Sequence, residues 1–274
     1  MELVKKAFDH DIPSFLKAYP KSVYLIHWLQ RLFYIRNAHI YREIKKNNPN
    51  NHETVWDVGC GDGQFSLYEL FNTKHTVVGT DRNKQWLDFL TTFTKKTGRG
   101  SFRFHLLGED APLNLQFDRI YCFAVLPCVD NVTESFETFR DCLNENGVLH
   151  VYVPINFKIE IPLYKSMFEK FHHAEKGQNR TQIFTKDEIL NYAKSAKLEP
   201  IYMRETYGFY GRIGHEMWSI TTMLLGSSKI LHNVLGVLTT IPVFIVLQIL
   251  KFVDLKQTIK NGNGLYVTFQ KEVS

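Results

Sequence analysis

The spacing of hydrophobic residues changes near residue 50. Between Tyr24 and Lys46 the apolar positions recur at steps of three and four, which predicts helical structure with one apolar face. That face is made up of Leu25, Trp28, Leu29, Leu32 and Phe33. The polar stretch 47–52, NNPNNH, predicts a loop. We therefore expect residues 1–50 to form an N-terminal helical cap on a second unit, residues 51–274.

Beyond this loop, β-prone runs alternate with helical segments. Strands are expected at 54–58, 76–80, 102–107, 117–123 and 148–153, and helices at 65–71, 84–96 and 132–143. After a polar, mixed stretch, residues 185–196 predict a helix with a capping box from Thr185 to Glu188, and 199–207 and 264–270 predict two more strands. Alternating strands and helices predict a parallel sheet covered on both faces. The expected fold is α/β, doubly wound around a mostly parallel seven-stranded sheet.

An apolar segment precedes the last predicted strand. No residue from Ile230 to Leu250 carries a formal charge, and this segment is long enough to span a membrane. A single crossing would place the last strand on the wrong side of the membrane, and Pro242 is expected to kink or break a helix. We therefore expect an apolar helical insertion at 212–258 that forms a re-entrant or in-plane hairpin at a membrane. The alternative is a buried helical subdomain or a dimer face, and both interpretations expect 234–250 to be buried.

Composition narrows the class of protein. The 274 residues are 44% hydrophobic and 22% charged, as in folded globular proteins. A net charge of +5 without a basic run does not predict nucleic-acid binding, but it is compatible with an anionic membrane surface. The four cysteines form no C-x-x-C pair, so no metal site is predicted. The N-terminus shows no apolar stretch of a secretory signal, and we expect a cytoplasmic protein, peripheral or monotopic at the inner face of a membrane.

The strongest chemical signal is the run DVGCGDG, which starts at Asp57 inside the first predicted strand. Glycine adopts positive φ and lets the backbone approach a ligand closely. The helix that follows offers free N–H groups at its start. A dinucleotide-binding turn would read G-x-G-x-x-G, but Gln64 stands at the position of the last glycine, so this spacing disfavours NAD.

This run resembles motif I of the class I S-adenosylmethionine (SAM)-dependent methyltransferases. The resemblance implies that the glycines line the methionine part of SAM and that Asp57 helps to position it. It also implies that Asp81, which ends the second strand, accepts the ribose hydroxyls, and that Asp110 reaches the adenine amino group. The residues assigned to the cofactor site are Asp57, Gly59, Cys60, Gly61, Gly63, Asp81, Arg82, Glu109, Asp110 and Ala111.

Two further stretches are similar to this family, and one departs from it. FDRI at 117–120 and LNENGVL at 143–149 resemble the segments that begin the fourth and fifth strands. The loop LPCVD at 126–130 lacks the histidine or aromatic pair that many relatives carry there. A non-catalytic SAM-binding scaffold therefore stays open as an alternative.

The acceptor site leaves a weaker signal than the cofactor site. If the apolar segment meets a membrane, a lipid, an isoprenoid or a lipid-linked molecule is the expected acceptor. A soluble small-molecule methyltransferase, whose apolar helices form the acceptor pocket or a dimer face, is the alternative. The weak catalytic candidates are His215, Tyr207 and Tyr210, and His215 could act as a base oriented by Glu216.

Overall fold

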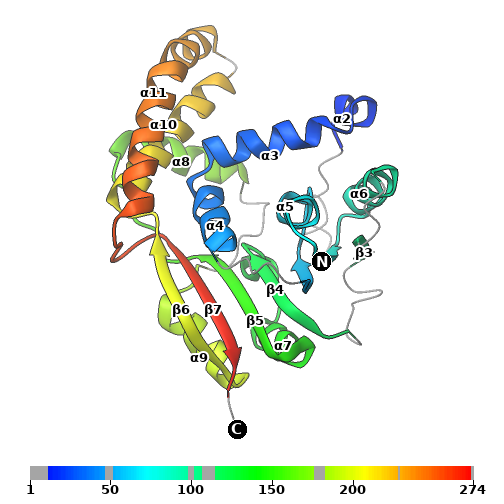
Figure 1. Cartoon of the computed structure of the whole chain (residues 1–274). Coiled ribbons are helices and arrows are strands. Elements are labelled where there is room, and N and C mark those ends of the chain that lie inside the picture. The colour runs from blue at the N-terminus through cyan, green and yellow to red at the C-terminus, as the bar shows by residue number, and fades with distance from the viewer. Residues whose placement is uncertain are drawn as a thin grey trace.

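A computed structural model describes residues 12–46, 52–97, 102–106, 115–175, 183–227 and 229–272. Its centre is a seven-stranded sheet of strand order β3-β2-β1-β4-β5-β7-β6 (Figure 1). The strands are β1 (Thr54–Val58), β2 (Thr76–Asp81), β3 (Phe102–Leu106), β4 (Phe117–Phe123), β5 (Leu143–Pro154), β6 (Leu198–Thr206) and β7 (Gly264–Lys271). Strands β1 to β5 are parallel, whereas β7 runs antiparallel to both β5 and β6. The predicted doubly wound α/β fold is confirmed.

The carboxyl ends of the parallel strands meet at one edge of the sheet, which we call the upper edge. The end of β6 and the start of β7 lie there too, because Thr206 pairs with Gly264 and Gly264 pairs with Pro154. Ligands of open α/β sheets bind outside this edge. The glycine turn after β1 and the α10–α11 insertion between β6 and β7 both start at this edge.

Helices cover both faces of the sheet. On one face α4 (Ile35–Lys46) and α5 (Gln64–Asn72) bury Ile40, Ile44 and neighbouring apolar residues, and α6 (Lys84–Lys96) packs beside α5. On the other face lie α7 (Val132–Cys142) and α9 (Lys186–Ser195). The predicted capping box of Thr185 and Glu188 is present at the start of α9. Within 154–185, where no element was expected, the chain forms α8 (Pro162–Glu175).

The N-terminal segment differs from its prediction. It forms α2 (Ser14–Ala18), α3 (Ser22–Phe33) and α4, because Tyr34 adopts an extended conformation and ends α3. The expected apolar face of α3 is not its buried face. Leu25 and Trp28 are each 56% exposed, whereas Val23 and His27 are buried. The inner side of α3 packs on α5 and α6 through residues such as Val23 and Tyr24. These residues do not belong to the expected apolar face.

The apolar insertion is a helical hairpin of α10 (Phe209–Leu225) and α11 (Ile230–Lys256) that projects from the upper edge (Figure 1). The two helices approach closely where Gly236 faces Leu225 and where Gly211 faces Asp254. Helix α11 continues through Pro242, so of the expected kink or break the break does not occur. Contacts with α10 lie on both sides of Pro242, at Gly236 and at Asp254, and they support the helix where one N–H bond is missing.

Residues 234–250 are not buried inside the chain, which counts against the alternative of a buried helical subdomain. In its most apolar 18-residue window, only 11% of α11 is buried inside the protein. Helix α10 covers one side, and the other side exposes Ile230, Leu231, Val234, Leu235, Val237, Leu238, Ile241, Ile245, Val246, Ile249 and Phe252. We call these residues the apolar stripe. Among the described helices, α11 is the one long and apolar enough to cross a membrane by length and composition.

Candidate cofactor site

The glycine turn between β1 and α5 has the backbone that its sequence requires. Gly59, Gly61 and Gly63 have φ values of 64°, 53° and 78°, a region that glycine adopts without steric cost. A Cβ on Gly59 would lie 2.5 Å from Val125 Cγ2, so the loop after β4 packs directly on the turn. A Cβ on Gly61 would meet no heavy atom of the described residues within 4 Å. Gly61 therefore presents bare backbone to the open side of the turn.

Asp81 ties the end of β2 to this turn. Its Oδ2 accepts a hydrogen bond from the Gly61 amide at 2.8 Å, and its Oδ1 accepts one from the Asn83 amide at 2.8 Å. A carboxylate oxygen has two lone pairs, so each oxygen can accept a further bond. The next residue, Arg82, is exposed. Asp81 and the glycines, which were assigned to the cofactor site from the sequence, thus lie together at the upper edge.

Asp57 and Cys60 lie beneath the turn and not on its open side. Asp57 is 2% exposed, and its Oδ2 accepts a hydrogen bond from the Ser66 hydroxyl at 2.5 Å. Burial raises the pKa of Asp57 to about 7, although the bonds from Ser66 oppose the shift. Burial also raises the pKa of the Cys60 thiol well above its ordinary value. Asp57 therefore supports the glycine turn from below, through its bond to Ser66 at the start of α5.

The N-terminal helices reach the turn with residues that the sequence did not single out. Gln30 Nε2 of α3 donates to Asp62 Oδ2 at 2.9 Å, and His27 Nε2 lies 3.5 Å from the same oxygen. Burial by itself would raise the pKa of Asp62, but these two contacts outweigh it and lower that pKa. Asn37 Nδ2 of α4 donates to Gln64 Oε1 at 3.1 Å. No periodic pattern marks such residues, because they contact a segment 27 to 35 positions away.

Two buried polar atoms beside the turn provide a test of whether SAM fits here. Gln30 Oε1 and Gln64 Nε2 have no hydrogen-bond partner among the described residues. Buried amide groups are normally paired, so these two atoms are available to a water molecule or to a polar ligand. The methionine end of SAM carries an ammonium group, which can donate to Gln30 Oε1, and a carboxylate, which can accept from Gln64 Nε2. With Asp81 for the ribose, the described residues fit this cofactor. Glu109, Asp110 and Ala111 lie outside the described residues.

The weak catalytic candidates lie at the base of the hairpin. The rings of Tyr207 and His215 are 5.6 Å apart, and the Tyr207 hydroxyl accepts a hydrogen bond from the Arg36 amide of α4 at 3.0 Å. Tyr210 is 41% exposed and its ring packs on Phe209, so it does not join the pair.

The expected orienting role of Glu216 is wrong. Its carboxylate accepts hydrogen bonds from the amides of Glu160 and Ile161, at 3.0 and 2.6 Å, on the loop after β5. Consecutive helical residues point in different directions, so His215 and Glu216 face different neighbours. His215 packs between the rings of Tyr164 and Tyr207 instead.

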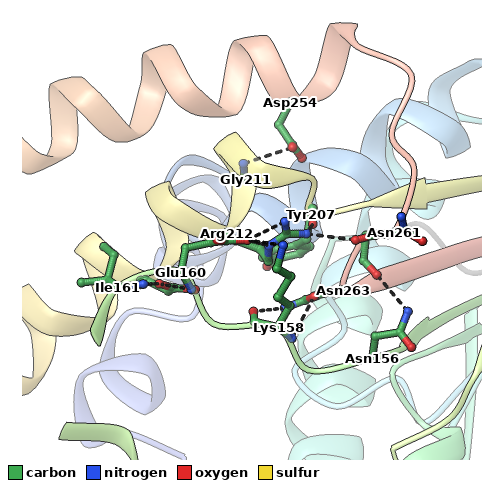
Figure 2. A network of polar contacts seen from close by, with 12 residues as sticks. Asn156, Lys158, Glu160, Ile161, Tyr207, Gly211, Arg212, Asp254, Asn261 and Asn263 are labelled. Carbon is green, nitrogen blue, oxygen red and sulfur yellow. Dashed lines mark hydrogen bonds and ion pairs between the residues drawn. The ribbon is translucent and has the colours of Figure 1, made fainter. Parts of the chain in front are cut away.

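A polar network fixes the hairpin base to the upper edge (Figure 2). The buried Arg212 donates to Glu160 Oε1 at 2.8 Å and to the carbonyls of Tyr207 and Asn261 at 3.1 Å each. Asp254 Oδ1 accepts from the Gly211 amide at 3.1 Å, and Asp254 Oδ2 lies 2.8 Å from His39 Nε2. The hairpin is therefore fixed to α4 and to the loops that follow β5 and precede β7.

The described residues contain a cavity away from this site and no metal-binding cluster. A cavity of 720 Å³ lies between α2 and α6, lined by residues such as Ile12, Lys17 and Phe89, and it does not reach the glycine turn. Within the described ranges, no group of three His, Cys, Asp or Glu side chains could hold a metal ion.

Comparisons with known proteins agree with this geometry. Residues 56–149, from β1 into β5, match the family model of a methyltransferase domain. No curated protein matches the chain.

Solved structures share the fold at low sequence identity. A TehB-like SAM-dependent methyltransferase from Corynebacterium glutamicum has 15% identity and a TM-score of 0.51 over 95% of this chain and 100% of its own. Phosphoethanolamine N-methyltransferase 2 of Haemonchus contortus, in complex with SAM, has 12% identity and a TM-score of 0.56 over 86% of this chain and 53% of its own. The cyclase SpnF has 13% identity and a TM-score of 0.56 over 87% and 82%. Since a cyclase shares the fold, the fold by itself does not determine the acceptor chemistry.

Proposed function

We propose that this chain is a class I SAM-dependent methyltransferase that transfers a methyl group from SAM to a hydrophobic or lipid-linked acceptor held in a membrane. The observation that carries the proposal is the place of the α10–α11 hairpin. It begins directly after β6 and returns directly before β7, at the edge of the sheet where the glycine turn lies. An apolar surface thus stands beside the cofactor site.

The apolar stripe supports a membrane as the partner of this hairpin. From Ile230 to Phe252 it extends for about 33 Å, against a hydrocarbon thickness of about 30 Å. Full burial of an Ile or Leu side chain contributes about 1.5–3 kcal/mol, so burial of several residues of the stripe in lipid would favour membrane binding. Both ends of the hairpin join one sheet and therefore lie on one side of the bilayer, so the hairpin enters or lies on the membrane from that side.

The chemistry follows from the site. When bound, SAM supplies a methyl group made electrophilic by the sulfonium. The glycine turn and Asp81 orient the cofactor, and α3 and α4 shield the turn from water. A general base is needed if the acceptor is a hydroxyl. The pair of Tyr207 and His215, between α4 and the hairpin, is the candidate group for that role.

The transfer step can be tested with SAM labelled in its methyl group and vesicles made from a total lipid extract. We expect label in the organic phase with the native protein. Asp81→Asn removes a carboxylate that a ribose would use, and a charged hydrogen bond contributes about 1.5–3 kcal/mol, so SAM affinity should fall about 10- to 100-fold. Asp88→Asn, an exposed carboxylate on α6, is the matched control and should change nothing. Equal SAM binding by both variants would remove the cofactor assignment.

The membrane step is tested separately by vesicle flotation. The triple variant Ile241→Glu, Ile245→Glu, Ile249→Glu places three charges on the stripe and should abolish flotation while SAM binding stays intact. Gln85→Glu with Thr92→Glu, on the exposed side of α6, is the control. If the triple variant still floats and still labels lipid, the membrane part of the proposal is wrong. If the native protein is soluble and methylates a water-soluble acceptor instead, the acceptor class is wrong.

A further inference from the structure

Helix α3 has two dissimilar sides. Its inner side holds His27 and Gln30, which contact Asp62 in the glycine turn. Its outer side exposes Leu25 and Trp28. Large apolar side chains that are exposed together on one helix face indicate an interaction surface. Helix α3 itself lies across the upper edge, on the side from which the hairpin projects (Figure 1).

The C-terminal turn of α3 contacts the hairpin. The carbonyl of Leu32, in the last turn of α3, accepts hydrogen bonds from Gln248 Nε2 at 3.1 Å and from Lys251 Nζ at 2.7 Å. Phe33 stacks on Trp218 of α10 with ring centroids 4.5 Å apart. The two helices thus form one body, and a surface that binds α11 meets the end of α3 as well.

The charge around α3 identifies the kind of surface that it fits. Residues 12–42 contain five basic residues and no Asp or Glu. Lys17, Lys21 and Arg31 are exposed on or beside α3. A helix with apolar and aromatic residues on one side and basic residues at its borders is typical of helices that lie in the interface of an anionic membrane. Phe15 and Tyr19, which are exposed on and just after α2, extend the aromatic surface.

We propose that α3 docks its outer side, Leu25 and Trp28, on an anionic bilayer and that this contact, relayed through His27 and Gln30 to Asp62, tightens the binding of the cofactor. The proposal rests on the membrane function proposed above. It adds a second membrane-binding element and a coupling between the bilayer and the glycine turn. A bilayer that holds α3 in place holds Gln30 against the turn, where its Oε1 is available to the ammonium group of the ligand.

The coupling can be measured with S-adenosylhomocysteine, which binds as the product and is not consumed. Its dissociation constant is determined by calorimetry with the native protein, with and without vesicles of phosphatidylglycerol and phosphatidylcholine. We expect anionic vesicles to lower it about 5- to 20-fold, within the usual range of coupling between two sites. The double variant Leu25→Gln, Trp28→Gln alters exposed residues and should fold. It should keep the affinity measured without vesicles and lose the change that vesicles cause.

The outcomes separate this proposal from the one on which it rests. If the native protein does not float with vesicles, the membrane function fails and this inference fails with it. If the protein floats but vesicles do not change the dissociation constant, or change it equally in the double variant, this inference alone is overturned.

The position of Trp28 gives an independent readout. Vesicles with brominated acyl chains should quench part of the tryptophan fluorescence of the native protein. The Trp28→Phe variant should lack this quenched part. Equal quenching in both proteins would place this face away from lipid. A change from dimer to monomer in the double variant, without any effect of vesicles, would identify a second copy as the occupant and overturn the proposal.

Discussion

The glycine turn and the α10–α11 hairpin lie at the same edge of the sheet, but they differ in which groups the chain leaves without an internal partner. At the turn the apolar side chains are covered, whereas Gln30 Oε1 and Gln64 Nε2 lack hydrogen-bond partners among the described residues. At the hairpin the polar side chains of Arg212 and Asp254 are paired, whereas the apolar stripe is exposed.

The difference indicates two kinds of binding partner. A buried polar atom without a partner costs about 1–3 kcal/mol, which a polar ligand can recover. An apolar side chain left in water forgoes about 1.5–3 kcal/mol of burial, which an apolar phase can recover. The turn is therefore complementary to a small polar molecule, and the hairpin to an apolar surface.

The largest change in stability is expected from a substitution at the tightly packed hairpin base. A Cβ on Gly211 would lie 2.5 Å from Asp254 Oδ2, which also pairs with His39. Gly211→Ala should therefore lower the free energy of unfolding by about 3 kcal/mol, through overpacking and a disturbed buried hydrogen bond between Asp254 and His39.

Chemical denaturation measures this loss, and limited proteolysis shows whether the hairpin detaches. Gly226→Ala, at the exposed hairpin tip with its nearest contact at 3.5 Å, is the matched control and should change stability by less than about 0.5 kcal/mol. Equal stability of the two variants would mean that the hairpin base is loosely packed.

A smaller effect separates the two sides of the glycine turn. Gly59→Ala puts a Cβ on a left-handed backbone and places it 2.5 Å from Val125 Cγ2. These two effects should lower the free energy of unfolding by about 2–3 kcal/mol. Gly61→Ala has only the backbone strain, about 1 kcal/mol, but its methyl group faces the ligand side and should weaken SAM binding about tenfold or more. Thermal unfolding and calorimetry on both variants measure the two quantities. A Gly61→Ala protein that binds SAM normally would show that the cofactor does not approach this glycine.

The smallest expected effect concerns pH. Burial raises the pKa of Asp57 from 3.8 to about 7, so the folded protein keeps a proton that the unfolded chain releases. The free energy of unfolding should therefore fall as pH rises between these two values, by about 2 kcal/mol from about pH 5 to about pH 7. Asp57→Asn, which cannot titrate, should flatten this part of the stability curve, and Asp88→Asn should leave it unchanged. A curve of unaltered slope for Asp57→Asn would assign the pH dependence to other groups.

Local chemistry explains how much of this molecule could be predicted. The strands of the sheet and the helices α5, α6, α7 and α9 follow from hydrophobic spacing, and their bounds agree closely with expectation. The glycine turn was recognisable because glycine is needed there for its backbone angles. Helix α8 was missed because its residues are polar and mixed, and the long helix expected at 24–46 was divided because nothing at Tyr34 resembles a break.

The sequence by itself determined which residues form the sheet, where the glycine turn lies and that residues 230–250 form an uncharged apolar segment. Only the tertiary structure decided that α3 turns its expected apolar face outward, that Gln30 and Gln64 border the turn, and that the stripe of α11 is uncovered. The physical reason is distance along the chain. Lys251 and Leu32, which join α11 to α3, are 219 positions apart, and no local pattern of hydrophobicity records such a contact.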